Sequence, residues 1–303
     1  MINSHVATRA IALALALAMG GCGGEAGDAN SEKLQEQAAG TQTPQRIISL
    51  IPSVTETIVA LGATDRLVAR SQYDVDPRLD DLPSVGQGLT PSLEQLARLE
   101  PDLVVAWPDN PMRSVIARLE ELGVSIYSPE VQTLDDMRET ARDLGAMLGL
   151  ETRADSLIAT IDQELDEIRQ TVAGRPRPSV FYVVWYAPPT TSGSGTYIDE
   201  LIEIAGGQNI FADAPGLWPQ VSLEEAVRRQ PDIILLSKTR EHAPDIGRLR
   251  DEPGWRQLDA IQRGDVVQVD ANLYNRPGPR VVRAARELAH LLHPEAFQAN
   301  SPR

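Results

Sequence analysis

A run of small residues in the second half of the chain is the first place where catalytic chemistry could occur. It is Ser192-Gly193-Ser194-Gly195, and a serine on a tight glycine turn can act as a nucleophile when a histidine and an acid support it. The G-x-S-x-G spacing of such a turn is missing, and no histidine and acid follow in a plausible order. Neither a dinucleotide glycine fingerprint nor a phosphate-binding loop follows the first expected strand. The sequence therefore predicts that the chain is not an enzyme and has no catalytic residue.

Two glutamates occupy equivalent positions in a repeated segment. One copy begins Ser92-Leu93-Glu94-Gln95 and the other Ser222-Leu223-Glu224-Glu225, and a Pro-Asp pair with an apolar run follows each. Ser followed three residues later by Gln or Glu is typical of a capping box, so each copy should begin a short helix. The helix dipole alone favours a carboxylate in a first turn. A glutamate next to the capping serine nevertheless recurs in both copies, which makes Glu94 and Glu224 candidate interaction residues.

The repeat indicates a doubled α/β fold. Continuous apolar runs that alternate with helices are typical of parallel strands covered on both faces. Each copy supplies one such run, at 103–106 and 233–236, and further strands are expected at 46–50, 124–127, 179–184 and 265–269.

Residues 150–172 between the two halves carry an apolar stripe at helical spacing. At 1.5 Å per residue such a helix would be roughly 35 Å long, and one stiff helix would permit little hinge closure. The predicted fold is α/β, with two similar lobes whose parallel sheets are flanked by helices, joined by this long rigid helix. A last helix, from about 278 to 292, should pack on the second lobe.

The N-terminal segment has the features of a secretory signal. Arg9 precedes an apolar run over 10–19, and Gly20-Gly21 comes directly before Cys22. The run is too short to span a bilayer as a helix. A small residue before the cysteine resembles the bacterial lipoprotein signal, which implies that Cys22 is lipidated and becomes the mature N-terminus. Residues 23–44 have few large apolar side chains, as expected of a flexible tether.

The charge of the chain limits its partners. Its net charge is -15, and a nucleic-acid backbone would be repelled. Cys22 is the only cysteine, which excludes an internal disulfide and a cysteine metal cage.

The predicted organisation is a signal peptide (1–21), a lipidated tether (22–44), an N-terminal α/β lobe (45–149), a connecting helix (150–173), a C-terminal α/β lobe (174–296) and a tail (297–303).

The chain from 46 to 292 resembles the periplasmic binding proteins whose lobes are joined by a long helix, which serve importers of cobalamin, haem and ferric siderophores. The likeness is closest to the members that bind cobalamin. It rests on motifs that recur in the same order: Ile48-Ser49-Leu50, Pro52, Thr55-Glu56, Pro101-Asp102-Leu103-Val104, Ala106-Trp107, Pro188-Pro189, Thr191-Ser192-Gly193 and Trp218-Pro219-Gln220-Val221-Ser222.

The resemblance implies a ligand site in a cleft between the lobes. Flat aromatic walls with a few polar handles suit a large planar macrocycle, and the transported ligand is expected to be cobalamin or another corrinoid. No cofactor of the protein's own and no metal site are expected. The implied ligand-binding residues are Tyr73, Trp107, Trp218 and Arg276.

Four positions differ from the cobalamin-binding members. Trp185 and Tyr186 introduce aromatics where those members have smaller or aliphatic residues, so both are further ligand-binding candidates. Gly88 stands where those members have an aromatic residue, and Asn272 replaces an acidic neighbour of Arg276.

The resemblance also implies partners and a location. The family uses two glutamates to dock onto transporter arginines, which implies this role for Glu94 and Glu224. The partners would be the permease subunits of an ABC importer, a small-molecule ligand and, through the lipid anchor, a membrane. The chain would act as a monomer in the periplasm or on the cell surface.

Several alternatives stay open. The same fold could bind haem or a ferric siderophore, although a siderophore site should carry several Arg or Tyr donors. Proteins of another class would be a secreted lipoprotein hydrolase, or a sensor that needs no docking glutamates. His242, in the polar stretch 238–245, could coordinate a haem iron or a corrinoid cobalt, but a solvated loop histidine is the simpler interpretation.

Overall fold

A computed structural model describes residues 43–88, 91–108, 112–239 and 244–298. The expected signal peptide, Cys22, nearly all of the expected tether and His242 lie outside these residues. The described residues fall within one unit by their contacts. In this part of the chain, no helix combines the length and the apolar character that crossing a membrane requires.

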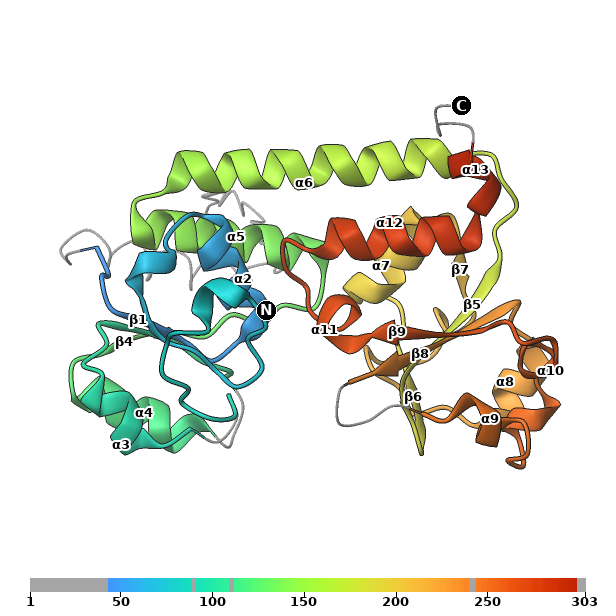
Figure 1. The fold of residues 1–303 in the computed structure, drawn as a ribbon, viewed down its shortest axis with the longest axis horizontal. Helices are drawn as coiled ribbons and strands as arrows, with labels where there is room; N and C mark the ends of the chain where they lie inside the picture. The colour runs from blue at the N-terminus through green and yellow to red at the C-terminus, as the bar shows by residue number, and fades with distance from the viewer. Residues whose placement is uncertain (1–42, 89–90, 109–111, 240–243, 299–303) are drawn as a thin grey trace, which may run out of the picture. The chain divides into compact units, whose positions relative to one another are not determined.

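The first lobe is built on four parallel strands in the order β2-β1-β3-β4 (Figure 1). The two central strands, β1 and β3, are fully buried, as continuous apolar runs require. The elements of this lobe are β1 (Ile47–Ser49), α2 (Pro52–Ala60), β2 (Leu67–Ala69), α3 (Leu93–Arg98), β3 (Leu103–Val105), α4 (Arg113–Glu121), β4 (Ser125–Tyr127) and α5 (Leu134–Leu148), with short 3-10 helices at Thr64–Arg66 and Pro77–Leu79.

The second lobe holds a five-stranded sheet in the order β6-β5-β8-β9, with β7 also paired to β5. All of these pairings are parallel except the β5–β6 hairpin, which is antiparallel and was not expected from the sequence. The elements are β5 (Ser179–Tyr186), β6 (Pro189–Thr191), α7 (Tyr197–Ile204), β7 (Gln208–Asn209), α8 (Leu223–Arg229), β8 (Ile233–Lys238), α9 (Ile246–Leu249), a 3-10 helix (Trp255–Gln257), α10 (Asp259–Arg263), β9 (Val266–Asp270), α11 (Ala271–Tyr274), α12 (Val281–Leu292) and α13 (Pro294–Gln298).

The repeated helices α3 and α8 begin at the expected serines, but their capping is simpler than a full box. The Ser92 hydroxyl accepts a hydrogen bond from the Gln95 N–H at 3.3 Å, and the Ser222 hydroxyl accepts one from the Glu225 N–H at 3.1 Å. Among the described residues neither Gln95 nor Glu225 returns the bond through its side chain. Glu225 accepts from Arg229 Nε instead, at 2.6 Å. The serine alone satisfies one free N–H of each first turn.

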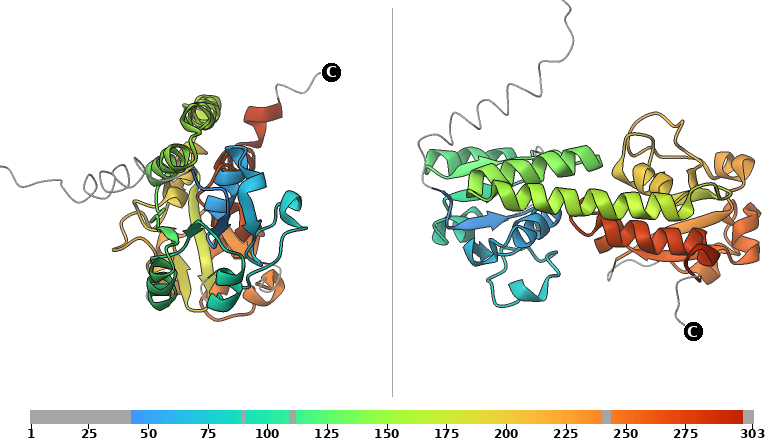
Figure 2. Two further views of the ribbon diagram at one scale, coloured as in Figure 1. Left: turned by 90° about the vertical axis from the view of Figure 1, so that its left-hand side faces the viewer. Right: turned by 90° about the horizontal axis from the view of Figure 1, so that it is seen from above.

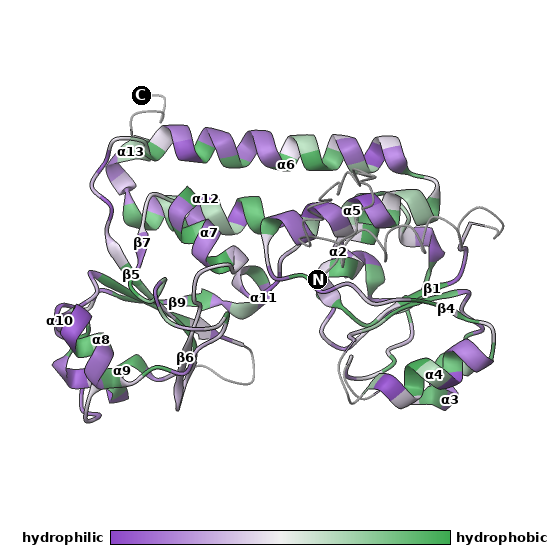
Figure 3. Ribbon diagram, turned by 180° about the vertical axis from the view of Figure 1, so that it is seen from behind, coloured by the Kyte–Doolittle hydropathy of each residue, from purple (hydrophilic) through white to green (hydrophobic). Residues whose placement is uncertain are grey.

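The long helix expected at 150–172 is α6 (Glu151–Val172). It contacts α5 and α12, and Figures 1 and 2 show it running along both. In Figure 3 the strands are mainly hydrophobic while α6 carries many hydrophilic turns, as expected of a helix with one buried stripe. That stripe is Ala154, Ile158, Ile161, Leu165, Ile168 and Val172.

Candidate ligand-binding site

A cavity of about 430 Å³ lies where the two lobes meet. Three predicted ligand-binding residues, Tyr73, Trp107 and Arg276, line it together. Gly88, which was noted as a departure from the family pattern, lines it as well. The full lining is Leu50, Pro52, Ser53, Tyr73, Gly88 and Trp107 from the first lobe, with Asn275, Arg276 and Pro277 from the second.

The sheet of the first lobe brings its cavity residues together. β1 and β3 are neighbouring parallel strands, so their carboxyl ends meet at one edge of the sheet. Leu50 directly follows β1, and Trp107 lies two residues beyond the end of β3. In α/β folds such an edge is where ligands bind.

The loop between α11 and α12 supplies the second lobe's part of the cavity. Gly278 lies against α2, because a Cβ added there would be 3.1 Å from the Ser53 carbonyl oxygen. The missing side chain allows this close approach. From the same loop Arg276 donates through Nη2 to the Tyr73 carbonyl oxygen at 2.8 Å and to Asn272 Oδ1 at 2.5 Å.

The Arg276 guanidinium is the main polar group of the cavity. Its side chain is only 12% exposed, and burial is the largest cause that lowers its pKa. Its Nη1 is buried and has no hydrogen-bond partner among the described residues. The carboxylate of Glu56 lies 3.6 Å from this atom, as an ion pair. An acceptor on a ligand could therefore complete the hydrogen bonding of Arg276.

Asp74, the next residue after Tyr73 in sequence, is buried. Its Oδ2 accepts a hydrogen bond from the Ser71 N–H at 2.7 Å. Burial raises the pKa of Asp74, while the hydrogen bonds from Ser71 and Thr55 and the charge of Arg276 partly oppose that rise. The carboxyl group thus takes up a proton more readily than an exposed aspartate does.

The main chain forms the wall of the cavity at Gly88. A Cβ at this position would lie 2.3 Å from the Leu50 carbonyl oxygen, closer than any real contact. The backbone at Gly88 passes directly over the end of β1. An aromatic side chain therefore cannot enter the cavity from position 88 in this conformation.

The other three predicted aromatics are on the second lobe and do not line this cavity. Trp218 is 37% exposed; its Nε1 donates to Gln132 Oε1 at 3.0 Å, and its ring meets Tyr197 edge-on. Trp185 is 46% exposed and donates to the Ala187 carbonyl oxygen at 2.9 Å. Tyr186 is partly buried and packs against the second lobe's core.

Sequence reasoning missed five residues of the cavity lining. Leu50 and Pro52 had a usable signal, because they directly follow the first strand and lie in the motifs that carry the family resemblance. Ser53, Asn275 and Pro277 have no such signal, since the contact between their segments depends on how the lobes pack.

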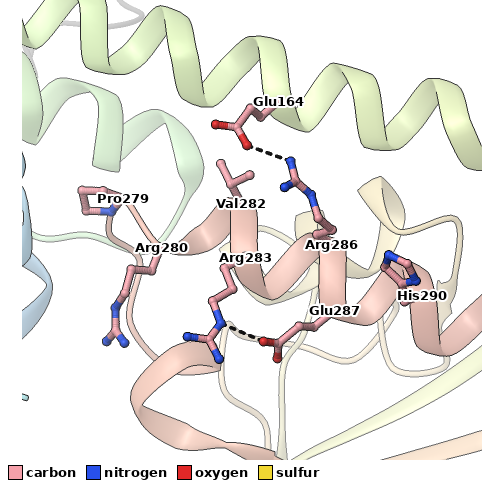
Figure 4. Close-up of a pocket in the computed structure, with 8 residues that line it drawn as sticks. All are labelled: Glu164, Pro279, Arg280, Val282, Arg283, Arg286, Glu287 and His290. Atoms are coloured by element: carbon pink, nitrogen blue, oxygen red, sulfur yellow. Dashed lines mark hydrogen bonds and ion pairs between the residues drawn. The ribbon is translucent and has the colours of Figure 1, made fainter. Parts of the chain in front are cut away.

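A larger hollow of about 670 Å³ lies between α6 and α12 (Figure 4). None of the predicted site residues lines it. Its charged side chains are largely paired, Arg286 with Glu164 at 2.7 Å and Arg283 with Glu287 at 2.8 Å. The hollow therefore lacks the aromatic walls and the incompletely bonded donor of the cavity at Arg276.

The two predicted docking glutamates occupy the first turns of α3 and α8. Glu94 forms an ion pair with Arg98 at 2.6 Å, and both side chains are about three-quarters exposed. Glu224 is exposed and has no ion pair with any described residue. Each lobe therefore presents one exposed carboxylate at an equivalent place in its repeat.

Within the described ranges no group of three or more His, Cys, Asp or Glu side chains could hold a metal ion. Ser192, in the run considered as a nucleophile turn, is fully buried. Its hydroxyl has no hydrogen-bond partner in that part of the chain, and therefore no base to activate it.

Two α/β lobes joined by a long helix, with an aromatic cavity at their junction, define a class of bilobed solute-binding proteins. The chain belongs to the periplasmic binding protein family, whose model matches residues 47–273. The fold class predicted from the sequence is thereby confirmed.

Three similar proteins illustrate the range of this family. The vitamin B12-binding protein of Vibrio cholerae serotype O1 is 34% identical over 254 residues, covering 82% of this chain and 89% of its own. An uncharacterized ABC transporter substrate-binding lipoprotein of Bacillus subtilis, YvrC, is 28% identical and covers 84% and 82%. The solved structure of the periplasmic haem-binding protein RhuT from Roseiflexus sp. RS-1, in apo form, has a TM-score of 0.74 at 26% identity, covering 83% of this chain and 99% of its own.

These relatives are solute-binding proteins, so the chain is a binding protein and not an enzyme, as predicted. Family membership places it in the periplasm or on the extracellular surface. Proteins of this kind deliver small molecules to the permease components of ABC transporters.

Proposed function

We propose that the chain is the substrate-binding lipoprotein of an ABC importer and that its ligand is cobalamin or a related corrinoid. The observation that carries this proposal is the cavity in which Tyr73, Trp107 and Arg276 come together from two lobes. The 34% identity to a vitamin B12-binding protein over most of both chains supports the same ligand.

The chemistry of the cavity suits the edge of a corrinoid. The rings of Tyr73 and Trp107 supply flat apolar surface, and burial of such surface contributes roughly 25 cal/mol per Å². The free Nη1 of Arg276 could donate to a carbonyl oxygen of the amide rim. A corrinoid is larger than 430 Å³, so the rest of the ligand would extend out of the cavity toward aromatics of the second lobe. We propose Trp185, Tyr186 and Trp218 for that contact.

Haem is the second candidate, favoured by a specific observation. Arg276 is a buried cation with an incomplete hydrogen-bond set, and carboxylates pair strongly with arginine. The haem-binding protein RhuT shares the fold at 26% identity.

Isothermal titration with cyanocobalamin, cobinamide, haemin and a ferric siderophore would test the ligand. We expect both corrinoids to bind more tightly than the other two. Trp107→Ala should weaken corrinoid binding about 100-fold, which corresponds to about 2.8 kcal/mol at 1.4 kcal/mol per tenfold. Leu122→Ala, which removes an exposed apolar side chain beyond α4, serves as the control and should leave binding unchanged. Heat from haemin or the siderophore with none from either corrinoid would overturn the ligand and keep the transport role.

The lipid anchor at Cys22 is part of the proposal. It is supported by the signal-like residues 1–21 and by the relative YvrC, a lipoprotein. Cys22→Ser should release a soluble form into the periplasm or medium, measured by fractionation and immunoblotting. A variant that stays in the membrane fraction as firmly as the parent would exclude the anchor.

A further inference from the structure

Glu56 is a carboxylate of the first lobe that two arginines of the second lobe share. It lies on α2 with its side chain 13% exposed. Arg280 donates to it through Nε at 2.9 Å and through Nη2 at 2.5 Å. Arg276, which lines the cavity, approaches the same carboxylate at 3.6 Å through Nη1 without a hydrogen bond.

Arg280 lies at the edge of the hollow beside α12, and its guanidinium reaches Glu56 at the interlobe junction. Figure 4 shows the neighbouring arginines engaged elsewhere, Arg286 with Glu164 and Arg283 with Glu287. The Arg280 Nη2 also donates to the Asn272 carbonyl oxygen at 2.7 Å. Three acceptor contacts therefore fix the Arg280 guanidinium on Glu56.

None of the hydrogen bonds that Arg276 donates to described residues goes to a carboxylate. Its Nη2 donates only to neutral acceptors, the Tyr73 carbonyl oxygen and the Asn272 side chain. Three carboxyl groups among the described residues act on the charge of Arg276, and Glu56 has the largest effect, ahead of Asp74 and Asp270, while the charge of Arg280 acts in the opposite direction. Asp74 is buried, and burial raises its pKa. Glu56 is thus the main negative charge that offsets Arg276 at the cavity.

We infer that Glu56 is a specificity-determining residue, which offsets the charge of Arg276 and so disfavours ligands that bring carboxylates into the cavity. This inference rests on the proposed function for its choice of ligands. A neutral carbonyl oxygen can still accept from Nη1, because the 3.6 Å ion pair does not occupy that donor with a hydrogen bond. A carboxylate on a ligand would instead be repelled by Glu56 at short range, in a site where salt screens little.

Ligand selectivity is the first test, with cyanocobalamin and haemin as probes. Glu56→Gln should shift the ratio of their affinities toward haemin by about tenfold, because one negative charge a few Å from a haemin carboxylate is removed. Glu56→Asp keeps the charge and should keep the parent's ratio. Glu164→Gln is the matched control: it removes the same charge from another ion pair to an arginine, that of Arg286, and should leave the ratio unchanged. Equal shifts in Glu56→Gln and Glu56→Asp would show a structural role only and overturn the inference.

A second test needs no ligand, so that it separates this inference from the proposed function. Trp107 lines the cavity. Its fluorescence is obtained by subtracting the emission of a Trp107→Phe variant from that of the protein with Trp107, both for the parent and for Glu56→Gln. Glu56→Gln should increase quenching of Trp107 by iodide, an anion, relative to quenching by neutral acrylamide. An unchanged ratio of the two quenching constants would overturn the inference even if both ligands bind. An increased ratio in a protein that binds neither probe would support the role of Glu56 and reject the proposed ligands.

Discussion

The Glu56 carboxylate accepts two hydrogen bonds from the Arg280 guanidinium, across 224 positions of sequence and from one lobe to the other. The pair is partly buried, with 34% of the Arg280 side chain and 13% of the Glu56 side chain exposed. Together with the close approach of Gly278 to α2, it holds the second lobe's loop on the first lobe. The long helix α6 is therefore not the only connection that sets the width of the cavity.

Arg280→Ala should lower the free energy of unfolding by about 1 to 2 kcal/mol, because Glu56 would lose both hydrogen bonds while staying largely buried. This is less than a fully buried pair would cost, since Arg280 is one-third exposed. Urea denaturation measures the difference. Arg98→Ala breaks the exposed pair with Glu94 and should change stability by less than about 0.5 kcal/mol. Equal losses in the two variants would contradict a stabilising interlobe pair.

The two-lobe fold could be predicted because its signals are local. The repeated Ser-Leu-Glu segments, the apolar runs and the stripe of α6 each depend on residues close together in sequence. The β5–β6 hairpin was missed, because Pro188-Pro189 and the short β6 give no alternating apolar pattern. The helices α3 and α8 begin at the serines that the sequence predicts. The reciprocal hydrogen bond of a full capping box, from the side chain of Gln95 or Glu225, was predicted wrongly. Glu225 has arginine partners one turn further along its own helix.

Gly88→Ala should destabilise the protein by about 1 to 3 kcal/mol, since its Cβ would meet the Leu50 carbonyl oxygen at 2.3 Å and force the main chain to shift. Leu50 and Gly88 both line the cavity, so ligand affinity should also fall, by about tenfold, or about 1.4 kcal/mol. Gly86→Ala is the control in the same segment. Gly86 has a φ of +84°, and a Cβ added there would meet no atom within 4 Å. Gly86→Ala should therefore lower the free energy of unfolding by about 1 kcal/mol and leave ligand affinity unchanged. Urea denaturation and titration calorimetry give both quantities.

The candidate site could be predicted only in part, for a physical reason. Tyr73, Trp107 and Arg276, which line the cavity, were predicted because they correspond to positions of a known family, and their role in binding stays a prediction. The same correspondence for Trp218 gives a residue that lies outside this cavity and bonds to Gln132. Glu56 was noted only as part of a motif. Its pairing with Arg280 depends on the packing of two lobes, which no local pattern encodes.

Asp74→Asn should stabilise the protein at neutral pH, with a benefit that depends on pH. Because burial raises the folded-state pKa of Asp74 above its usual value of 3.8, the folded state binds the proton more tightly than the unfolded state. Stability from this group is then fully present below pH 3.8 and is lost as pH rises through the raised folded pKa. The asparagine Oδ1 can still accept from the Ser71 N–H, and it does not ionise.

Thermal unfolding of both proteins from about pH 3 to pH 7 measures this effect. The advantage of Asp74→Asn should be near zero at the acidic end, grow as pH rises and then level off. Asp80→Asn changes an exposed carboxylate of the same lobe and controls for the general loss of charge. A benefit of Asp74→Asn that is constant across the range would show that the titration of Asp74 is not its cause.

Glu94→Ala combined with Glu224→Ala should abolish ligand uptake by cells while leaving ligand affinity of the purified protein unchanged. Each carboxylate can form charge-assisted hydrogen bonds to transporter arginines, worth about 1.5 to 3 kcal/mol each, and neither glutamate lines the cavity. Glu94 must first leave Arg98, whereas Glu224 has no ion pair to break among the described residues. Arg98→Ala should therefore keep uptake at or above the parent's level. Uptake of radiolabelled cyanocobalamin, alongside titration calorimetry, measures both properties.

The matched control for docking is Glu139→Ala combined with Glu203→Ala. It removes the same two charges from exposed positions on α5 and α7, one helix from each lobe, away from the repeated first turns. Uptake by this control should equal that of the parent, because a general change of net charge alters only long-range steering. Equal loss of uptake in both double variants would assign the effect to net charge. Normal uptake by the Glu94 and Glu224 double variant would remove these two residues from the docking role, since the contacts that hold the transporter would then have to lie elsewhere on the two lobes.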